Sequence, residues 1–479
     1  MGLASSLFSG ISGLSTLGNA MTVIGDNIAN VNTVGFKGSR VTFQDVLSQT
    51  VATTAGTAQV GRGTSLADIT SSFSQGSFES TDSTTDLAIG GKGFFIVRDP
   101  NSAENQFYTR AGQFRFDKDG NFVNPAGYIV RGWKLDQDGD DVGSETDIQM
   151  SSFTSPPQES RQIQAIVNLD SDGDDNSTHL ATPKAALSIA WDGTNSSPLG
   201  EDAYEYQTTL KVYDSLGSTH DIGIYFDKAD AASDYEFIVT CNPNEDKRDN
   251  GGNPVDPATD KHAGLLARGL IHFSAGSGVI SDIELFQVDG AGAEVEQDQA
   301  TDLTDGFFTF APAFISGSPM SIKLDFGSRS NGVSWTNSSL CTTMFARAST
   351  TTFQSADGAG AGDLQSITVG TDGGITGQYS NGQVIPLFRV ALAKFQNNQA
   401  LFKVGGNLFR ETRLSGDPIT GKPGSGGLGS ISPNSLEQSN VDIATEFVKM
   451  ITTQRGFQAN GKIITVTDQM LAELINLKR

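Results

Sequence analysis

The sequence predicts an elongated, multidomain and mainly β protein whose long N- and C-terminal helical segments pack as a coiled coil. Apolar residues recur in steps of four and three at both ends of the chain, as in a coiled-coil seam. The middle has short apolar runs between turn residues, and 55 of the 479 residues are glycine. This composition favours short strands and many turns over long surface helices. The length predicts three or four units rather than one domain.

The charge of the chain is concentrated in its middle. The formal net charge is −23, from 32 basic and 55 acidic side chains. Residues 1–47 are neutral and residues 440–479 nearly so, which leaves almost all of the negative charge between them. Neutral ends suit burial against other protein, whereas an acidic middle suits water. Because a polyanion repels nucleic acid, we expect no nucleic-acid partner.

The first thirty residues carry the N-terminal seam. A straight helix over residues 3–30 would span roughly 40 Å. Four glycines lie inside this helix, and each costs about 1 kcal/mol relative to alanine. We therefore expect the helix to form only against partners on more than one face, and to order on assembly. The apolar members of this seam are Leu3, Leu7, Leu14, Leu17, Met21, Ile24, Ile28 and Val31.

The last forty residues carry the second seam. Ser439, followed three residues later by Asp442, indicates the start of a long C-terminal helix. Either seam alone is also explained by an ordinary amphipathic helix on a core. Two nearly neutral seams at opposite ends of one chain favour packing on each other. The apolar members of this seam are Ile443, Phe447, Met450, Phe457, Ile464, Leu471 and Ile475.

Two runs near the chain ends are distinctive. The first is GDNIANVNTVGFK at residues 25–37, and the second is EFVKMITTQRGFQAN at residues 446–460, continued by DQML at residues 468–471. Both runs resemble the signatures of the flagellar rod and hook axial proteins. Asn32 and Gly35 suit a helix exit because both tolerate left-handed or turn conformations. The residues that carry the resemblance are Ala29, Asn30, Asn32, Thr33, Gly35, Phe36, Lys37, Gln454, Arg455, Asn460 and Asp468.

The resemblance implies a structural subunit of the bacterial flagellar hook. Such a subunit assembles with itself into a hollow, flexible helical tube, a universal joint that transmits torque from rod to filament. As partners the resemblance implies the distal rod, the hook cap, the hook–filament junction proteins and the flagellar export apparatus. It also implies secretion without membrane insertion. The distal rod is the close rival, since both classes share the terminal signatures, but the length and a large insertion favour the hook.

The pattern in the middle of the chain predicts an extended arm and two β regions. Alternating apolar runs flank the turns at residues 117–120 and 214–217, which is a hairpin signal. The outer region forms one domain or two. The expected parts are a terminal helical core (1–35 and 436–479), an extended connector arm (36–75 and 425–435), an inner β-domain (76–160 and 360–424) and an outer β-domain insertion (161–359).

Motifs for catalysis or cofactor binding are absent from the sequence. Its four histidines have no metal-ligand spacing such as HExxH, and neither a GxSxG elbow nor a phosphate loop occurs. The acidic runs at 136–141 and 170–175 place glycine fourth rather than sixth, which favours solvated turns over calcium loops. Cys241 and Cys341 leave open one disulfide or two free thiols. We expect no enzyme, no cofactor and no metal site.

A second hypothesis is a monomeric secreted β-protein, such as an adhesin or a calcium-dependent binding module. The acidic, β-rich middle fits this class of protein. This class does not explain the neutral heptad seams at the two ends. The N-terminus lacks the basic start and the apolar run of a secretory signal. No apolar stretch is expected to approach the about 18 residues that a membrane span needs.

Overall fold

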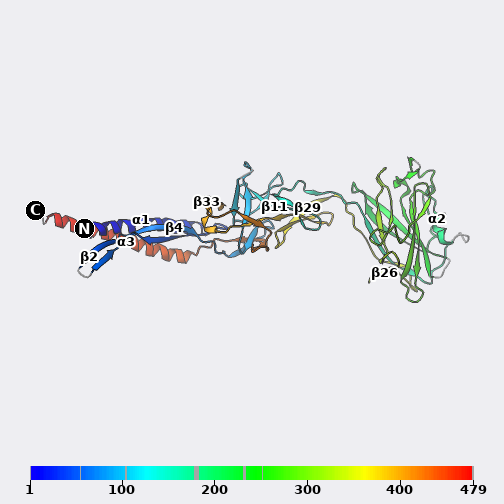
Figure 1. Ribbon diagram of the computed structural model, residues 1–479. Helices are drawn as coiled ribbons and strands as arrows, with labels where there is room; N and C mark the ends of the chain where they lie inside the picture. The colour runs from blue at the N-terminus through cyan, green and yellow to red at the C-terminus, as the bar shows by residue number, and fades with distance from the viewer. Residues whose placement is uncertain are drawn as a thin grey trace. The chain divides into compact units, whose positions relative to one another are not determined.

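The chain divides into two compact units (Figure 1). Unit 1 comprises Met1–Phe153, Leu364–Tyr379 and Val384–Arg479, and unit 2 comprises Thr154–Asp363 and Ser380–Gln383. Unit 2 is therefore an insertion within the sequence of unit 1. The structure is a computed structural model, and it describes residues 2–53, 56–102, 105–176, 183–229, 233–250 and 252–476.

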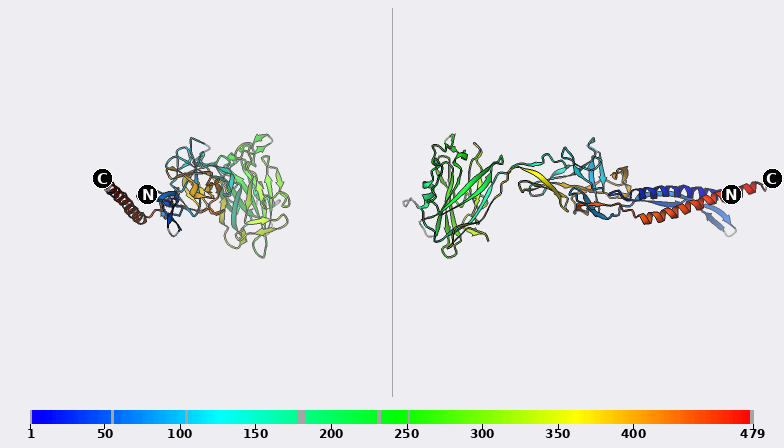
Figure 2. Two further views of the ribbon diagram at one scale, coloured as in Figure 1. Left: turned by 60° about the vertical axis from the view of Figure 1, so that its left-hand side comes forward. Right: turned by 180° about the vertical axis from the view of Figure 1, so that it is seen from behind.

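Unit 1 contains two long helices from opposite ends of the chain, α1 (Gly2–Ala29) and α3 (Ile443–Asn476). They lie side by side in Figure 1 and again in the rear view of Figure 2. The Asp442 carboxylate accepts a hydrogen bond from the Thr445 backbone N–H at 2.7 Å, so Asp442 is the N-cap of α3. The expected start at Ser439 is therefore three residues early.

Helix α1 corrects one expectation about apolar stretches. Residues Ser5–Ala29 have the length and the mean hydropathy, 1.3, of a helix that could cross a membrane. The polar residues of this segment are small and uncharged apart from Asp26, so they lower the hydropathy only slightly. Helices that pack in protein cores meet the same criteria. In this chain α1 packs against protein on two sides.

A two-stranded ribbon follows α1 and lies along it (Figure 1). Strand β1 (Ser39–Asp45) pairs with β4 (Thr64–Ser71), and β2 (Gln49–Thr53) pairs with β3 (Gly56–Val60) in the hairpin between them. The Thr64 N–H donates to the Ser12 hydroxyl at 3.2 Å, and the Thr16 and Thr64 hydroxyls lie 3.2 Å apart. The expected connector arm thus contains paired strands, and α1 has the ribbon on one side and α3 on another.

Most other strands of unit 1 form one antiparallel sheet, in the order β29-β30-β31-β11-β7-β8-β34-β33. Strands β9, β10, β12, β32 and β35 attach to it. Its core holds buried Phe95, Val97, Val130 and Val390. The bounds are β7 (Phe94–Arg98), β8 (Gln106–Thr109), β9 (Arg115–Phe116), β10 (Phe122–Val123), β11 (Ile129–Leu135), β12 (Asp141–Asp147), β29 (Gly362–Val369), β30 (Gly374–Tyr379), β31 (Val384–Val390), β32 (Leu392–Lys394), η3 (Asn398–Ala400), β33 (Phe402–Gly405), β34 (Leu408–Arg410) and β35 (Ile419–Gly421).

Two short strand pairs bring the C-terminal return of the chain against its early part. Strand β5 (Phe78–Ser80) pairs with β37 (Ser435–Glu437), and β6 (Leu87–Gly90) pairs with β36 (Ser430–Pro433). Both pairs are antiparallel. They place Glu437 beside the chain that follows the ribbon.

Unit 2 consists of two sheets that share one core. The first is antiparallel, in the order β15-β16-β17-β20-β21-β22, and the second is β23-β24-β14-β27 with β28 also paired to β14. A smaller apolar cluster lies on the opposite face of the first sheet and includes Leu187 of the short helix α2. Cys241 is buried in the core, Cys341 is half-buried, and both are free thiols.

The bounds in this unit are β13 (Thr154–Ser155), β14 (Gln162–Asp170), η1 (Pro183–Ala185), α2 (Ala186–Ala190), β15 (Tyr206–Tyr213), β16 (Thr219–Lys228), β17 (Asp234–Cys241), η2 (Pro243–Glu245), β18 (Asp249–Asn250), β19 (Asn253–Pro254), β20 (Leu265–Phe273), β21 (Ile280–Val288), β22 (Glu294–Glu296), β23 (Phe308–Phe310), β24 (Ile322–Asp325), β25 (Ser328–Ser330), β26 (Trp335–Asn337), β27 (Thr343–Phe345) and β28 (Thr350–Ala356).

One turn design recurs in both units and accounts for part of the acidity. In the hairpin between β15 and β16 the Asp214 carboxylate accepts hydrogen bonds from the N–H groups of Leu216, at 2.9 Å, and Ser218, at 2.8 Å. Gly217 supplies the positive φ of 85° that this turn needs. The side chain thus replaces water at N–H groups that the hairpin leaves unpaired. The same arrangement begins at Asp117, Asn124, Asp136 and Asp289.

These turns predict a specific loss of stability. Asp289→Ala removes the acceptor for the N–H groups of Ala291 and Ala293, and we expect a cost of about 1 kcal/mol in the unfolding free energy of unit 2. Asp289→Asn keeps the same oxygen and should cost much less. The measurement is urea unfolding followed by fluorescence of Trp191 and Trp335. Equal losses in the two variants would contradict the assignment.

Candidate assembly site

The two terminal helices approach each other through glycines. A Cβ atom on Gly13 of α1 would lie 2.9 Å from the amide oxygen of Asn460 on α3. A Cβ atom on Gly456 would lie 3.1 Å from Leu17, and one on Gly10 would lie 3.3 Å from Ile464. At these separations the facing side chains would have to shift to admit a methyl group. The glycines that weaken α1 as an isolated helix therefore permit its close packing on α3.

The N-terminal seam residues lie largely in protected positions. Ile24 is buried, with 7% of its surface exposed. The other described members are half-buried, namely Leu7, Leu14, Leu17, Met21, Ile28 and Val31. The side chain of Leu3 lies outside the described part of the chain. The ribbon and α3 together cover these positions only in part, which leaves apolar surface on α1, above all at Phe8.

The C-terminal seam residues are placed differently. Only Met450 and Ile464 are half-buried, whereas Ile443, Phe447, Phe457, Leu471 and Ile475 are exposed. The side of α3 that its own chain covers is mostly small or polar, and consists of Glu446, Met450, Thr453, Gly456, Asn460, Gly461, Ile464 and Thr467. Apart from Met450 and Ile464, the apolar stripe of α3 therefore does not face α1 within one chain.

A polar joint fixes the ends of the two helices. The Asn27 side chain is 3% exposed. Its oxygen accepts from the Ser39 N–H and its amide donates to the Ser39 carbonyl, both at 2.8 Å. The side chain thus bonds to the Ser39 backbone as a neighbouring strand would. The same amide donates to the Glu446 carboxylate of α3 at 3.3 Å. The Asn440 oxygen accepts from the Gly38 N–H at 2.9 Å. Asn27 and Asn440 thus bind the exit of α1 to the root of α3.

The centre of this terminal joint is a buried carboxylate. Glu437 accepts from the Lys37 ammonium at 2.6 Å and from the Arg110 guanidinium at 3.2 Å, and the side chains of Lys37 and Glu437 are fully buried. The Gly76 N–H donates to it at 2.9 Å. Burial lowers the pKa of Lys37, which the hydrogen bond to Glu437 opposes, and burial also lowers the pKa of Arg110. Three distant segments therefore meet at one carboxylate.

The exit of α1 is held from a further side by the β33–β34 hairpin. The Lys403 ammonium lies 5.2 Å from the centre of the Phe36 ring and donates to the Lys37 carbonyl at 3.2 Å. The Asn407 amide donates to the Val34 carbonyl at 2.7 Å. Gly35 has a φ of 70°, and a Cβ atom there would lie 2.5 Å from the Ala111 nitrogen. This position therefore requires glycine, as the helix-exit interpretation expects.

The signature residues divide between the joint and the surface. Gly35, Phe36 and Lys37 are buried in the joint, while Asn30, Thr33 and Asn460 are half-buried. The others, Ala29, Asn32, Gln454, Arg455 and Asp468, are exposed.

Sequence reasoning missed Asn27, Arg110, Glu437, Asn440 and Glu446 as members of the joint. A fully buried Lys37 needs a counter-ion, and that requirement is the only signal that could have led to Glu437. No pattern in the sequence identifies Arg110.

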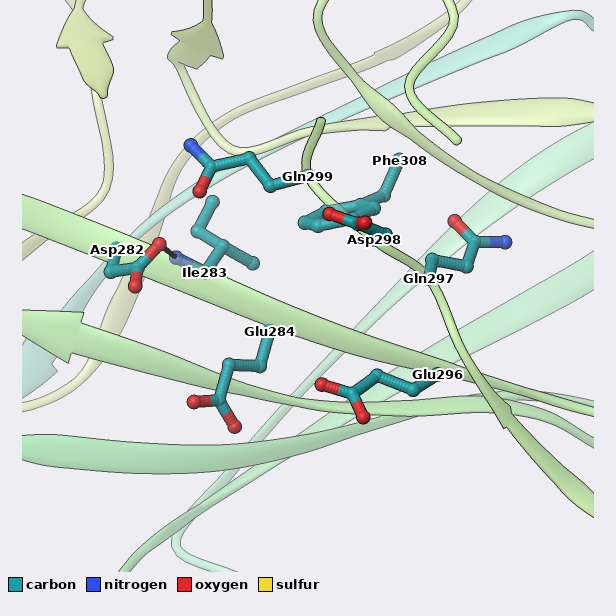
Figure 3. Close-up of a pocket in the computed structure, with 8 residues that line it drawn as sticks. All are labelled: Asp282, Ile283, Glu284, Glu296, Gln297, Asp298, Gln299 and Phe308. Carbon is teal, nitrogen blue, oxygen red and sulfur yellow. Dashed lines mark hydrogen bonds between the residues drawn. The ribbon is translucent and has the colours of Figure 1, made fainter. Parts of the chain in front are cut away.

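Unit 2 contains an acidic cavity of about 470 Å³. Figure 3 shows Glu284 and Glu296 near each other, and Asp282 and Asp298 also line the cavity. Asp282 accepts from the Trp335 indole N–H at 2.7 Å, and Glu284 lies 3.5 Å from His272. Within the described ranges, no group of three or more His, Cys, Asp or Glu side chains could hold a metal ion.

Models of flagellar protein families match most of the chain. The descriptions are "Flagella basal body rod protein" at residues 7–37, "Flagellar hook protein FlgE/F/G D1 domain" at 88–173, "Flagellar basal body protein FlaE D2 domain" at 176–359 and "Flagellar basal body rod FlgEFG protein C-terminal" at 432–477. The first and last of these matches cover the terminal signatures.

Curated relatives match the chain over nearly its whole length. The flagellar hook protein FlgE of Borreliella burgdorferi is 34% identical, and that of Treponema pallidum is 32% identical, each with 99% of both chains covered. FlgE of Salmonella typhimurium is 29% identical with 98% of both chains covered.

The buried carboxylate predicts unequal effects of two substitutions. Glu437→Gln leaves two buried cations without a counter-charge, and we expect a loss of about 3–5 kcal/mol in the stability of unit 1. Lys37→Met should cost clearly less, because Glu437 keeps its pairing with Arg110. The measurement is urea unfolding of the full chain followed by Trp133 fluorescence. The interpretation is wrong if Lys37→Met proves the more damaging change.

The helix contact predicts a rescue. Gly13→Ala favours the helical state of α1 by about 1 kcal/mol, yet it places a methyl group against the Asn460 side chain. We expect Gly13→Ala to lower the yield of polymer, because the Asn460 side chain must shift, and Gly13→Ala with Asn460→Ala to restore it. The measurement is the yield of polymer by sedimentation and electron microscopy. Normal assembly of Gly13→Ala alone would disprove the close contact.

Proposed function

The chain belongs to the family of flagellar hook proteins, and we propose that its terminal helices are the core through which identical chains assemble. As a hook protein it is a structural subunit of the bacterial flagellum and is located in the hook. There it polymerises into a hollow, flexible helical tube that transmits torque from the rod to the filament. Identical contacts that do not close on themselves generate such a helical polymer.

The apolar stripe left open on α3 is the observation that carries the proposal. Phe447 is 47% exposed, Phe457 40% and Ile475 67%, although the helix is paired with α1. A helix that is apolar beyond the face its own chain covers needs further protein around it. The exposed Phe8 and Ile11 of α1 add to this surface. We assign these residues to contacts between chains.

The sequence-based seam residues take their roles from this arrangement. The N-terminal members pack as a coiled coil with α3 of the same chain, whereas the exposed C-terminal members pack against helices of neighbouring chains. The proposed parts of the subunit remain the terminal helical core, the connector arm, the inner β-domain and the outer β-domain. The ribbon of β1 and β4 is the part of the connector arm that packs on α1.

The proposed partners beyond the chain itself are the distal rod, the hook cap, the hook–filament junction proteins and the flagellar export apparatus. The net charge of −23 supports the absence of nucleic acid from this list. The packing of α1 on both α3 and the ribbon supports a role in protein contacts rather than in a membrane. We propose no catalytic activity, because the family is structural.

Family membership decides between the alternatives left open by the sequence. Relatives that match over nearly the whole chain carry the name of the hook protein, which separates this chain from the distal rod. The hypothesis of a monomeric adhesin or calcium-dependent module is wrong for the same reason. The aspartate of the 136–141 run also closes its own turn.

The test is complementation of a strain that lacks this gene. The wild-type gene should restore hooks, whereas Phe447→Ser with Phe457→Ser should leave complete rods without hooks. Each phenylalanine buried between chains contributes about 2 kcal/mol, so the pair should weaken association by about a thousandfold. Phe345→Ser in unit 2, also at an exposed phenylalanine, is the matched control and should restore hooks.

Electron microscopy of basal bodies gives the readout, and immunoblots of the medium report export. Secreted but unassembled double variant supports the proposal. Normal hooks built from the double variant would refute the role of the α3 stripe. Truncated rods in the deletion strain would show that the protein is a rod subunit rather than a hook subunit.

A further inference from the structure

Two carboxyl side chains are buried next to each other on the outer face of the first sheet of unit 2. Asp227 on β16 and Glu236 on β17 are directly opposite in the antiparallel register, and each is 1% exposed. Opposite residues of an antiparallel pair lie on the same face, with Cβ atoms about 5 Å apart. Phe226 and Tyr235, their chain neighbours, face the core on the other side. The two carboxyls therefore form a pair of acidic groups away from water.

Among the residues that the structure describes, neither carboxyl has a basic side chain in contact. One oxygen of Glu236 accepts from the Leu187 N–H of α2 at 3.1 Å, and its other oxygen has no hydrogen-bond partner. Asp227 accepts from the Asn176 backbone and side-chain nitrogens, both at 3.4 Å. A buried carboxylate oxygen without a donor is costly when it is charged and cheap when it is neutral.

The charged groups around the pair do not neutralise it. Arg268 on β20 acts on Glu236, but Glu294 engages its guanidinium at 2.7 Å. The Lys228 ammonium is bound to the carbonyls of Ser171 and Gly173. Asp175 adds negative charge near Asp227. Within the described ranges, further titratable side chains of the covering segments and of the sheet include Lys184, Tyr204, Glu205, Tyr225 and Tyr235.

We propose that Asp227 and Glu236 form a proton-operated clasp: while the pair is protonated, α2 stays closed on the sheet, and loss of the protons opens it. Glu236 binds the first turn of α2, and Leu187 of this helix packs with Trp191, Leu199 and Ile238 in the small apolar cluster. Opening α2 lets water reach the Glu236 carboxylate, beside which Asp227 lies in the strand register. The apolar cluster is therefore exposed in response to pH. This inference is independent of the proposed assembly through the terminal helices.

The direction of the pH effect follows from burial. Burial raises the pKa of Asp227 and that of Glu236 to about 7, against ordinary values of 3.8 and 4.5. Between these ordinary values and about 7 the closed state holds more protons than the open state. Closure is therefore most stable in acid, weakens as the pH rises towards 7, and levels off above it.

Hydrogen exchange of the full chain tests the clasp. Between pH 6 and pH 8 the opening constant at the amides of Leu187 and Trp191, corrected for the intrinsic exchange rate, should rise about tenfold for each carboxyl that opens. Glu236→Gln keeps an acceptor for the Leu187 N–H and should remove one tenfold factor. Asp227→Asn should also reduce the rise in the opening constant. In the double variant the opening constant should not change between pH 6 and pH 8.

Asp221→Asn is the matched control, since Asp221 lies on the same strand with its side chain 60% exposed. It should keep the full wild-type rise. Amides of β17 report whether a variant still folds. A wild-type rise below about threefold, or an unchanged rise in both Glu236→Gln and Asp227→Asn, would overturn the clasp.

Discussion

The pairing of Glu437 with Lys37 and Arg110 holds the two ends of the chain in register. A charge removed from water is expensive unless its partners are correctly placed, so this site tolerates one arrangement of its three segments and penalises the others. An apolar contact of similar size would allow sliding, because it has no direction. Lys37 closes the exit of α1, and Glu437 lies just before α3. The joint therefore sets how far the helices run past each other, and this offset brings Gly13 opposite Asn460.

Much of the fold could be predicted from local pattern, and the errors have a common physical cause. The long terminal helices, the hairpin at Asp214 and the helix exit at Gly35 depend on neighbours in sequence, and all three occur. The heptad pattern of α3 identified a helix but not which side faces α1. Periodicity counts apolar side chains, whereas close approach selects glycine and small polar residues such as Gly456 and Asn460. Apolar spacing also cannot tell burial within one chain from burial between chains. The pairing of β37 with β5 stayed hidden because it joins distant segments.

Carboxylates serve three different purposes in this chain, and their surroundings decide which. Asp214 and the aspartates at the equivalent positions accept backbone hydrogen bonds that close hairpin turns. Glu437 lies in a dry site in which two cations accompany it. Glu236 has a dry site without a contacting cation, so the neutral form is favoured. Net charge counted from the sequence treats all three alike, which is why it described the solvent-facing middle well and missed both buried sites.

The turn design has a consequence for the time course of folding. The hydrogen bonds of each turn lie within five consecutive residues. A chain that is synthesised from its N-terminus can therefore complete these hairpins one after another. The terminal joint follows the opposite rule, because Lys37 and Glu437 are 400 positions apart. Glu437, which carries the carboxylate, is among the last residues of the chain to be synthesised. In an unfinished chain the hairpins can already be folded, whereas Lys37 remains exposed to water. Burial of Lys37 therefore marks the completion of the chain.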